Sequence, residues 1–235
     1  MITPDPGLDR TEAVIFDLDG TLYLQKPVRR AMLLRLLRAH LTRPLAGYRI
    51  IRFLSAYRRA QEELRIVAGT DAATRQLEIA CEQARFAPGA APAVVDRWMG
   101  REPLDLLRTH RREGLVELLE ALRADGRKLA LLSDYPAREK LAALEVEGLF
   151  DVVVCAQDPD VGAFKPSPRG LDVTLRRLGV QPRQALYVGD RPEVDYLAAK
   201  AAGVSCAIFS SAPRTAGFVP ITSCRELKAL LLGPR

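Results

Sequence analysis

The chain has 235 residues, of which 48% are hydrophobic and 27% charged, with a formal net charge of +6. This is an ordinary soluble globular composition, long enough to bury a sizeable core, and the four scattered cysteines exclude a disulfide scaffold. No apolar stretch approaches the roughly 20 residues that cross a bilayer, and the first residues lack the pattern of a secretory signal, so we expect a cytoplasmic protein.

The first predicted element is a strand, the apolar run AVIF at residues 13–16. Asp17 and Asp19 follow it directly, and Gly20 and Thr21 come next. Two carboxylates this close raise each other's pKa, which costs stability. Either the pair belongs to an acidic turn, or a cation lies between the two side chains.

The segment that follows, residues 25–112, reads as helix throughout, with no convincing strand. The apolar spacing predicts helices within it at residues 26–41, 46–69, 72–86 and 91–100. The segment interrupts the chain directly after the first strand, so we expect a helical cap that stands over the carboxyl edge of a sheet. The predicted domains are therefore a core of residues 1–24 and 113–235 and a cap of residues 25–112.

The cap segment also concentrates the positive charge. Between Lys26 and Arg65 the sequence has 11 basic residues and only two acidic ones, Glu62 and Glu63, a net charge of +9. We interpret this excess first as a solvated arginine-rich face, over apolar residues that pack the helices together: Met32, Leu33, Leu36, Leu37, Ile50, Ile51, Phe53 and Leu54. A second interpretation places some arginines in the cleft, where they attract a polyanionic or carboxylated substrate. The least favoured is peripheral contact with an anionic membrane, and we expect no nucleic acid partner.

The rest of the chain alternates short apolar strands with amphipathic helices. The pattern predicts helices at residues 114–126, 137–148, 168–179 and 192–203, and strands at residues 128–133, 150–156, 185–189 and 205–210. Continuous apolar strands joined by helices of this length are typical of a parallel sheet with both faces covered. We therefore predict an α/β fold, a doubly wound, Rossmann-like parallel sheet with an inserted all-helical cap domain.

Ligands of such sheets bind beyond the carboxyl ends of the strands, and polar residues follow four of the predicted strands there. They are Asp17 and Asp19, Ser133 and Asp134, Lys165, and finally Asp190 and Asp195. Each group alone has an ordinary explanation as a turn, a helix N-cap or a solvated lysine. Together they place hard oxygen ligands suited to Mg²⁺ beside a lysine and a hydroxyl suited to a phosphoryl group.

These segments resemble the haloacid dehalogenase superfamily, in particular its aspartate-nucleophile phosphatases with a helical cap after the first strand. FDLDGTL (16–22) is similar to the first motif of that family, LLSDYP (131–136) to the second, FKPSP (164–168) to the third and VGDRPEVDYLAAKAAG (188–203) to the fourth. The resemblance covers the core, whereas the cap matches only in position and helicity.

The resemblance implies that Asp17 is the nucleophile and a metal ligand. Asp19 would be the general acid and then the general base, with its backbone carbonyl on Mg²⁺, while Asp190 and Asp195 would complete the metal site. The family's dehalogenases lack an aspartate at the position of Asp19 because halide leaves without a proton. Asp19 therefore favours phosphoryl chemistry.

The same resemblance implies the residues that hold the phosphoryl group. Ser133 and the backbone N–H of Asp134 would bind its oxygens, Lys165 would neutralise the charge between phosphate and nucleophile, and Thr21 would support the loop.

We therefore predict a Mg²⁺-dependent phosphatase that hydrolyses a small phosphorylated metabolite through an aspartyl-phosphate, as a monomer or homodimer. Two alternatives stay open: a phosphosugar mutase that uses the same nucleophile, and a catalytically silent phosphate-binding or regulatory module.

Overall fold

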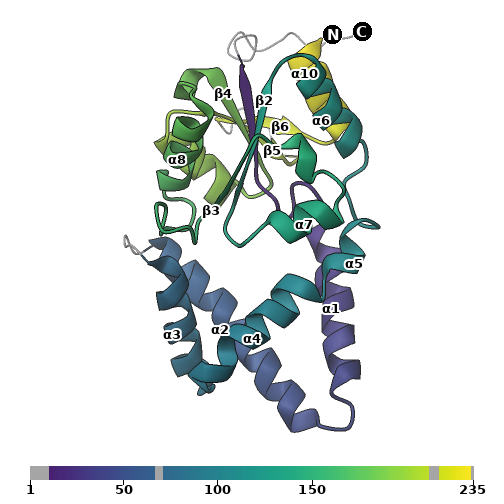
Figure 1. Ribbon diagram of the computed structural model, residues 1–235, viewed down its shortest axis with the longest axis vertical. Coiled ribbons are helices and arrows are strands. Elements are labelled where there is room, and N and C mark those ends of the chain that lie inside the picture. Colours follow the sequence, from purple (N-terminus) through teal and green to yellow (C-terminus); the bar gives the residue numbers. More distant parts are fainter. Residues whose placement is uncertain (1–10, 67–70, 212–216, 234–235) are drawn as a thin grey trace.

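A parallel sheet forms the centre of the computed structural model, which describes residues 11–66, 71–211 and 217–233 (Figure 1). In this described part the sheet has six strands in the order β3-β2-β1-β4-β5-β6, and every neighbouring pair is parallel. The strands are β1 (Ala13–Phe16), β2 (Lys128–Ser133), β3 (Val152–Cys155), β4 (Ala185–Gly189), β5 (Ser205–Phe209) and β6 (Val219–Ile221). The predicted α/β fold class is confirmed.

Alternate residues of the strands pack into two separate hydrophobic clusters, one on each face of the sheet. Val14 and Phe16 of β1 pack with the helices α6 and α10, whereas Ile15 packs with α8 and α9. Helices α6 and α10 lie on the opposite side of the sheet from α8 (Figure 1). The helices of this part are α6 (Leu115–Ala124), α7 (Arg138–Ala143), α8 (Arg169–Leu178), α9 (Leu197–Ala201) and α10 (Cys224–Leu232). Both faces are therefore covered, which explains the uninterrupted apolar sequence of the strands.

Three predicted helices are shorter than their apolar pattern. The α-helix expected at residues 91–100 ends at Val95 and continues as a π-helix, Asp96–Arg101. The helix expected at residues 137–148 ends at Ala143, because Glu145 adopts a left-handed conformation with φ 59° that does not continue a helix. The helix expected at residues 192–203 starts with a π-helical turn, Pro192–Tyr196. The sequence analysis also missed α10 and β6; β6 has only three residues, contains Pro220 and forms an edge of the sheet, where proline is tolerated.

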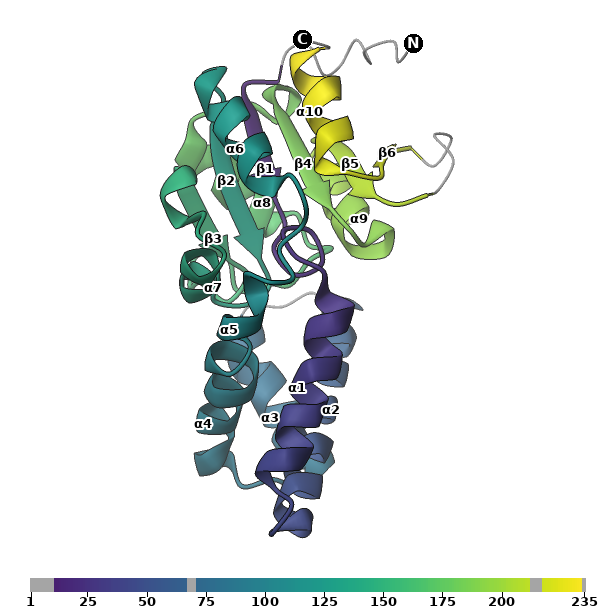
Figure 2. The same ribbon diagram turned by 90° about the vertical axis from the view of Figure 1, so that its right-hand side faces the viewer.

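The segment between β1 and α6 is helical, and its helices form a bundle at one end of the sheet (Figure 2). We call helices α1 to α5 the helical bundle: α1 (Gln25–Ala39), α2 (Pro44–Ile66), α3 (Ala72–Ala84), α4 (Ala91–Val95) and α5 (Leu104–Leu107). It has its own hydrophobic cluster, with Phe53 and Trp98 buried inside. The two chain connections to the sheet run side by side, because Leu24 N–H donates to His110 O and Arg112 N–H donates to Leu22 O.

The packing expected inside the bundle is correct for some residues and wrong for others. Leu36, Phe53 and Leu54 are buried, but Leu33 and Leu37 are about half exposed, because only one side of α1 packs on α2. Residues 67–69, the predicted end of the second helix, lie outside the described residues.

The cysteines Cys81, Cys155, Cys206 and Cys224 are free, as expected for a chain without a disulfide scaffold, and all four are buried. No helix in the described part of the chain has the length and hydropathy that a membrane crossing needs.

Candidate active site

The predicted polar residues gather at the carboxyl ends of three neighbouring strands. Phe16 of β1 pairs with Leu131 of β2 on one side and Val188 of β4 on the other. The next residues along these strands lead to Asp17, Ser133 and Asp190. The place is the switch point of the sheet, where the strand order reverses and a ligand crevice is expected.

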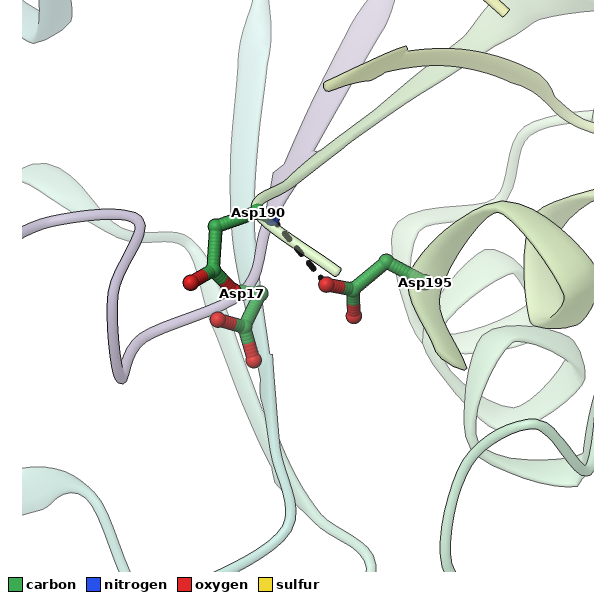
Figure 3. Close-up of side chains that lie close together, drawn as sticks. All are labelled: Asp17, Asp190 and Asp195. Carbon is green, nitrogen blue, oxygen red and sulfur yellow. Dashed lines mark hydrogen bonds between the residues drawn. The ribbon is translucent and has the colours of Figure 1, made fainter. Parts of the chain in front are cut away.

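Three carboxylates converge there, from Asp17, Asp190 and Asp195 (Figure 3). One oxygen of each lies within 4.8 Å of the others. Asp195 comes from the π-helical turn after β4, and its Oδ2 accepts hydrogen bonds from the backbone N–H groups of Asp190 (3.1 Å) and Arg191 (3.0 Å). The fold therefore holds Asp195 firmly and leaves the oxygens of Asp17 and Asp190 facing each other.

Two glycines make room for this cluster. Gly20 has φ +105°, and a Cβ atom at this position would overlap the carboxylate of Asp190. A Cβ atom at Gly189 would overlap the side chain of Asp195. Side-chain-free backbone packed against hard oxygen donors fits a site for Mg²⁺, which prefers carboxylates and water.

Lys165 is a protein cation that contacts the carboxylate cluster. Its Nζ donates to Asp17 Oδ1 (2.5 Å), Asp195 Oδ1 (2.7 Å) and the Tyr187 hydroxyl (3.0 Å). The side chain is buried, which lowers its pKa, but the carboxylates of Asp17 and Asp195 outweigh this and hold the pKa of Lys165 well above its ordinary value. Tyr187 lies in the middle of β4 and was not predicted to be part of the site. Its neighbours Leu186 and Val188 are apolar, so the sequence marks Tyr187 only as a core residue.

The carboxylates themselves are held in an unfavourable environment. Burial raises the pKa of Asp17 well above its ordinary value, against the effect of Lys165. Burial and the charge of Asp195 raise the pKa of Asp190 to about 6. A divalent cation between these groups would favour their charged forms, because it adds the positive charge that Lys165 alone does not provide.

The loop after β1 is fixed from two sides. Thr21 Oγ1 donates to Asp17 Oδ2 (3.0 Å), a contact that suits the supporting role that the resemblance implies for Thr21. Arg112, which the sequence analysis missed, donates from Nη2 to Gly20 O (2.5 Å) and from Nε to Thr21 O (2.8 Å). Nothing in its sequence context sets Arg112 apart from the other arginines of this segment.

Asp19 lies on the bundle side of the loop and has two partners that were not predicted. Lys140 of α7 donates to Asp19 Oδ1 (2.8 Å) and Oδ2 (3.2 Å), and the Tyr23 hydroxyl also donates to Oδ1. Burial raises the pKa of Asp19, but Lys140 and the Tyr23 hydroxyl lower it by more than burial raises it. The pKa of Asp19 is therefore below its ordinary value. Lys140 follows an ordinary helical pattern, so only the packing of α7 against the loop reveals its contact.

Ser133 ends β2 and Asp134 follows it, and neither caps the next helix, whose N-cap residue is Ala137. Ser133 is buried, and its Oγ accepts a hydrogen bond from Tyr135 N–H (3.2 Å). The Asp134 carboxylate turns towards the bundle and accepts from Gln61 Nε2 (3.1 Å) and Arg65 Nη2 (2.7 Å), both on α2. The sequence analysis considered only the backbone of Asp134 and missed this contact between sheet and bundle.

A cleft of about 590 Å³ separates the carboxylate cluster from the bundle. Its volume suits a small organic ligand. Arg29 of α1 and Arg58, Arg59 and Arg65 of α2 line its bundle side. Other arginines of the +9 segment, including Arg30, Arg38, Arg43 and Arg49, are exposed outside the cleft lining. The basic segment is therefore divided between the cleft and the outer surface.

Comparison with known proteins identifies relatives that match most of the chain. The sequence model of the haloacid dehalogenase-like hydrolases matches residues 11–203. The chain is 32% identical to a phosphoglycolate phosphatase of Rhodospirillum rubrum, over 85% of this chain and 79% of the relative. It is 30% identical to a glyceraldehyde 3-phosphate phosphatase of Methanopyrus kandleri, over 82% and 81%. A 2-haloacid dehalogenase of Pseudomonas syringae, at 24% identity, shares the fold with a TM-score of 0.65 over 94% of this chain and 98% of that one.

Proposed function

The chain belongs to the haloacid dehalogenase-like hydrolase family, and from this premise we propose that it is a Mg²⁺-dependent phosphatase of a small phosphomonoester, with Asp17 as the nucleophile. The contact that carries the proposal is the buried Lys165–Asp17 ion pair inside the carboxylate cluster. It supports the proposal because a carboxylate oxygen of Asp17 lies beside a fixed positive charge at the switch point of the sheet, an arrangement suited to phosphoryl transfer to a carboxylate.

Asp17 and Asp190 would hold Mg²⁺ directly, the carbonyl of Asp19 would add a ligand, and Asp195 would act directly or through water. When bound, the ion would neutralise the carboxylates and polarise the phosphoryl group. Each carboxylate oxygen of Asp195 already accepts two hydrogen bonds, whereas each oxygen of Asp17 accepts one, so contact through water suits Asp195 better than direct ligation.

In the proposed reaction the Asp17 carboxylate attacks phosphorus, and the bond between phosphorus and the ester oxygen breaks. Asp19 would give the departing oxygen a proton, which it must first take from the bound substrate or from water, because Lys140 and Tyr23 stabilise its carboxylate before the substrate binds. Asp19 then takes a proton from the water that attacks the aspartyl-phosphate. The Asp17–phosphorus bond breaks, and inorganic phosphate leaves.

The remaining predicted residues would hold the phosphoryl group. Lys165 would balance its charge, and the Ser133 hydroxyl and the backbone N–H of Asp134 would donate to its oxygens.

The substrates named for the two relatives, phosphoglycolate and glyceraldehyde 3-phosphate, are small organic phosphates, which supports a small substrate here. We propose that the helical bundle is the cap that covers this substrate, and a monomer or homodimer in the cytoplasm stays our expectation.

Phosphate release from a panel of small phosphomonoesters tests the proposal, with EDTA-treated protein before and after Mg²⁺ is added. We expect activity that requires Mg²⁺, and borohydride reduction of the quenched enzyme should yield homoserine at position 17, as an aspartyl-phosphate requires. Product isomers without free phosphate from hexose 1-phosphates would instead establish a mutase. Phosphate binding without turnover on any ester would establish a silent binding module.

A further inference from the structure

One face of helix α2 points at the active site and carries four polar side chains at helical spacing, Arg58, Gln61, Glu62 and Arg65. The last three pair with the sheet domain, as we call the described residues before α1 and after α5. Gln61 and Arg65 donate to Asp134, Arg65 also donates to the carbonyl of Lys165, and Glu62 accepts from Arg191 (3.0 Å). These contacts fix the end of α2 over the site and set the position of Arg58 one turn earlier.

Arg58 differs from the other three because it has no hydrogen bond or ion pair within the part of the chain that the structure describes. The same holds, over residues 11–66, 71–211 and 217–233, for Arg29 of α1. Both side chains line the cleft and are in contact with its solvent. The surrounding protein and the charge of Arg29 lower the pKa of Arg58, so the two guanidinium groups are near enough to repel each other.

The acidic side chains of the cleft are already engaged by other groups. Lys165 binds Asp17 and Asp195, and Lys140 binds Asp19. Glu62 pairs with Arg191, and Glu63 accepts from Gln83 (3.1 Å). Asp190 faces the carboxylate cluster, where Mg²⁺ is proposed. Glu63 keeps its charge, because its partner Gln83 is neutral, but no carboxylate in the described part of the chain pairs with Arg29 or Arg58. These two guanidinium groups are therefore available to the anion of a ligand.

We propose that Arg29 and Arg58 form a second anion subsite on the bundle side of the cleft, which binds a carboxylate or a second phosphate of the substrate. The inference rests on the proposed function, because it assumes that the phosphoryl group of the same molecule lies at Asp17. The planar guanidinium presents paired donors to either type of anion, which a single ammonium group does not. The substrate class is thus a small phosphomonoester with a second negative group.

Three two-carbon esters separate the outcomes, because they differ only in the group at the far end. Ethyl phosphate has a methyl group there, 2-phosphoglycolate a carboxylate, and ethylene glycol bisphosphate a second phosphate. We expect kcat/KM to be at least about tenfold higher for one or both charged esters than for ethyl phosphate. Which charged ester is preferred identifies the anion.

The variants Arg58→Gln and Arg29→Gln should each reduce this preference by about tenfold, with the loss mainly in the charged esters. Arg30→Gln on α1 and Arg49→Gln on α2 are matched controls. They remove the same charge from exposed positions outside the cleft lining, and the preference should stay as in the wild type.

The inference is wrong if the wild type shows no preference for a charged ester, if Arg58→Gln reduces kcat/KM for all three esters equally, or if the control variants lose the preference to the same extent. If the wild type releases phosphate from no ester, the proposed function fails separately. The subsite is then decided by calorimetric binding of the three esters to Asp17→Asn with and without Arg58→Gln. A preference for charged esters that disappears with Arg58 supports the subsite, and equal binding overturns it.

Discussion

The sheet domain and the helical bundle use charge in opposite ways. In the sheet domain the charges of the site are buried and paired, as in the contacts of Lys165 with Asp17 and Asp195. In the bundle Arg29, Arg58 and Arg59 of the cleft are exposed, and Arg29 and Arg58 have no partner in the described part of the chain, whereas the side chain of Arg65 is buried against Asp134. Buried pairs fix a geometry before the substrate arrives, whereas solvated charges can accept different anions. The comparison suggests that the sheet domain determines the chemistry and the bundle the substrate.

The largest effect should come from the nucleophile. Asp17→Asn should lower kcat by about four orders of magnitude or more, because the amide does not attack phosphorus. The fold should persist, because burial already disfavours the charged form of Asp17, as its raised pKa shows, and the amide of Asn carries no charge. Phosphate release and a circular dichroism melt measure the two quantities. Substantial remaining activity would show that the sheet domain does not supply the chemistry in the way we propose.

Lys165→Met should lower the stability of the metal-free protein by about 3–5 kcal/mol at neutral pH, because it leaves buried carboxylates without their cation. Mg²⁺ should restore part of the loss. The matched control is Lys200→Met, at an exposed position on α9, which should change the free energy of unfolding by less than about 0.5 kcal/mol. Urea denaturation with and without Mg²⁺ measures both variants. Equal effects would remove the contrast between buried and exposed charge.

The contact between the two regions depends on Asp134. Asp134→Ala removes the carboxylate that accepts from Arg65 Nη2 and Gln61 Nε2, which should cost about 1–3 kcal/mol and loosen α2 from the sheet. Hydrogen exchange of the α2 amides should become faster, while the amides of β1 keep their protection. If α2 exchanges as slowly as in the wild type, the contact does not hold the bundle in place.

The pKa of Asp190 predicts a pH dependence of the metal site. The pKa of Asp190 is about 6 in the metal-free folded protein and 3.8 ordinarily, so between pH 3.8 and pH 6 the folded protein binds a proton at Asp190 that the unfolded chain does not. This proton stabilises the folded protein at low pH, and its contribution to the free energy of unfolding is lost as the pH rises from about 4 to above 6. Mg²⁺ competes with that proton, and the rise in melting temperature on adding Mg²⁺ should be larger at pH 7.5 than at pH 5.0. In Asp190→Asn this difference should shrink, and an equal rise at both pH values in the wild type would contradict the prediction.

The smallest effect is expected on the outer side of the bundle. Leu37 is 47% exposed, so Leu37→Gln should change the free energy of unfolding by less than about 0.5 kcal/mol. Its neighbour Leu36 is 4% exposed, and Leu36→Ala should cost about 2–5 kcal/mol. Thermal melts of the two variants compare the faces of α1. A large loss for Leu37→Gln would show that the outer face is covered in solution.

The sequence by itself determined the sheet and the residues that follow its strands. Continuous apolar runs predict buried parallel strands because both faces are covered, and the switch-point rule then brings Asp17, Ser133 and Asp190 to one edge without further information. The elements with weak local signals were missed: β6 is a short edge strand that contains proline, and Glu145 ends α7 through a backbone conformation that its residue type does not announce.

Only the tertiary structure decided which long polar side chains meet. Lys140, Arg112 and Arg58 look like ordinary helical or loop cations in the sequence, and nothing local separates Arg58 from Arg49 on the same helix. Lys140 meets Asp19 because of the face of α7 that lies against the loop after β1, and Arg112 reaches that loop from the connection before α6. Arg58 lines the cleft because of the face of α2 that is turned towards the sheet. All three depend on contacts between residues far apart in the chain. The strand ends are specified by local pattern, whereas the arginines of the cleft are specified by the packing of α1 and α2 above the sheet.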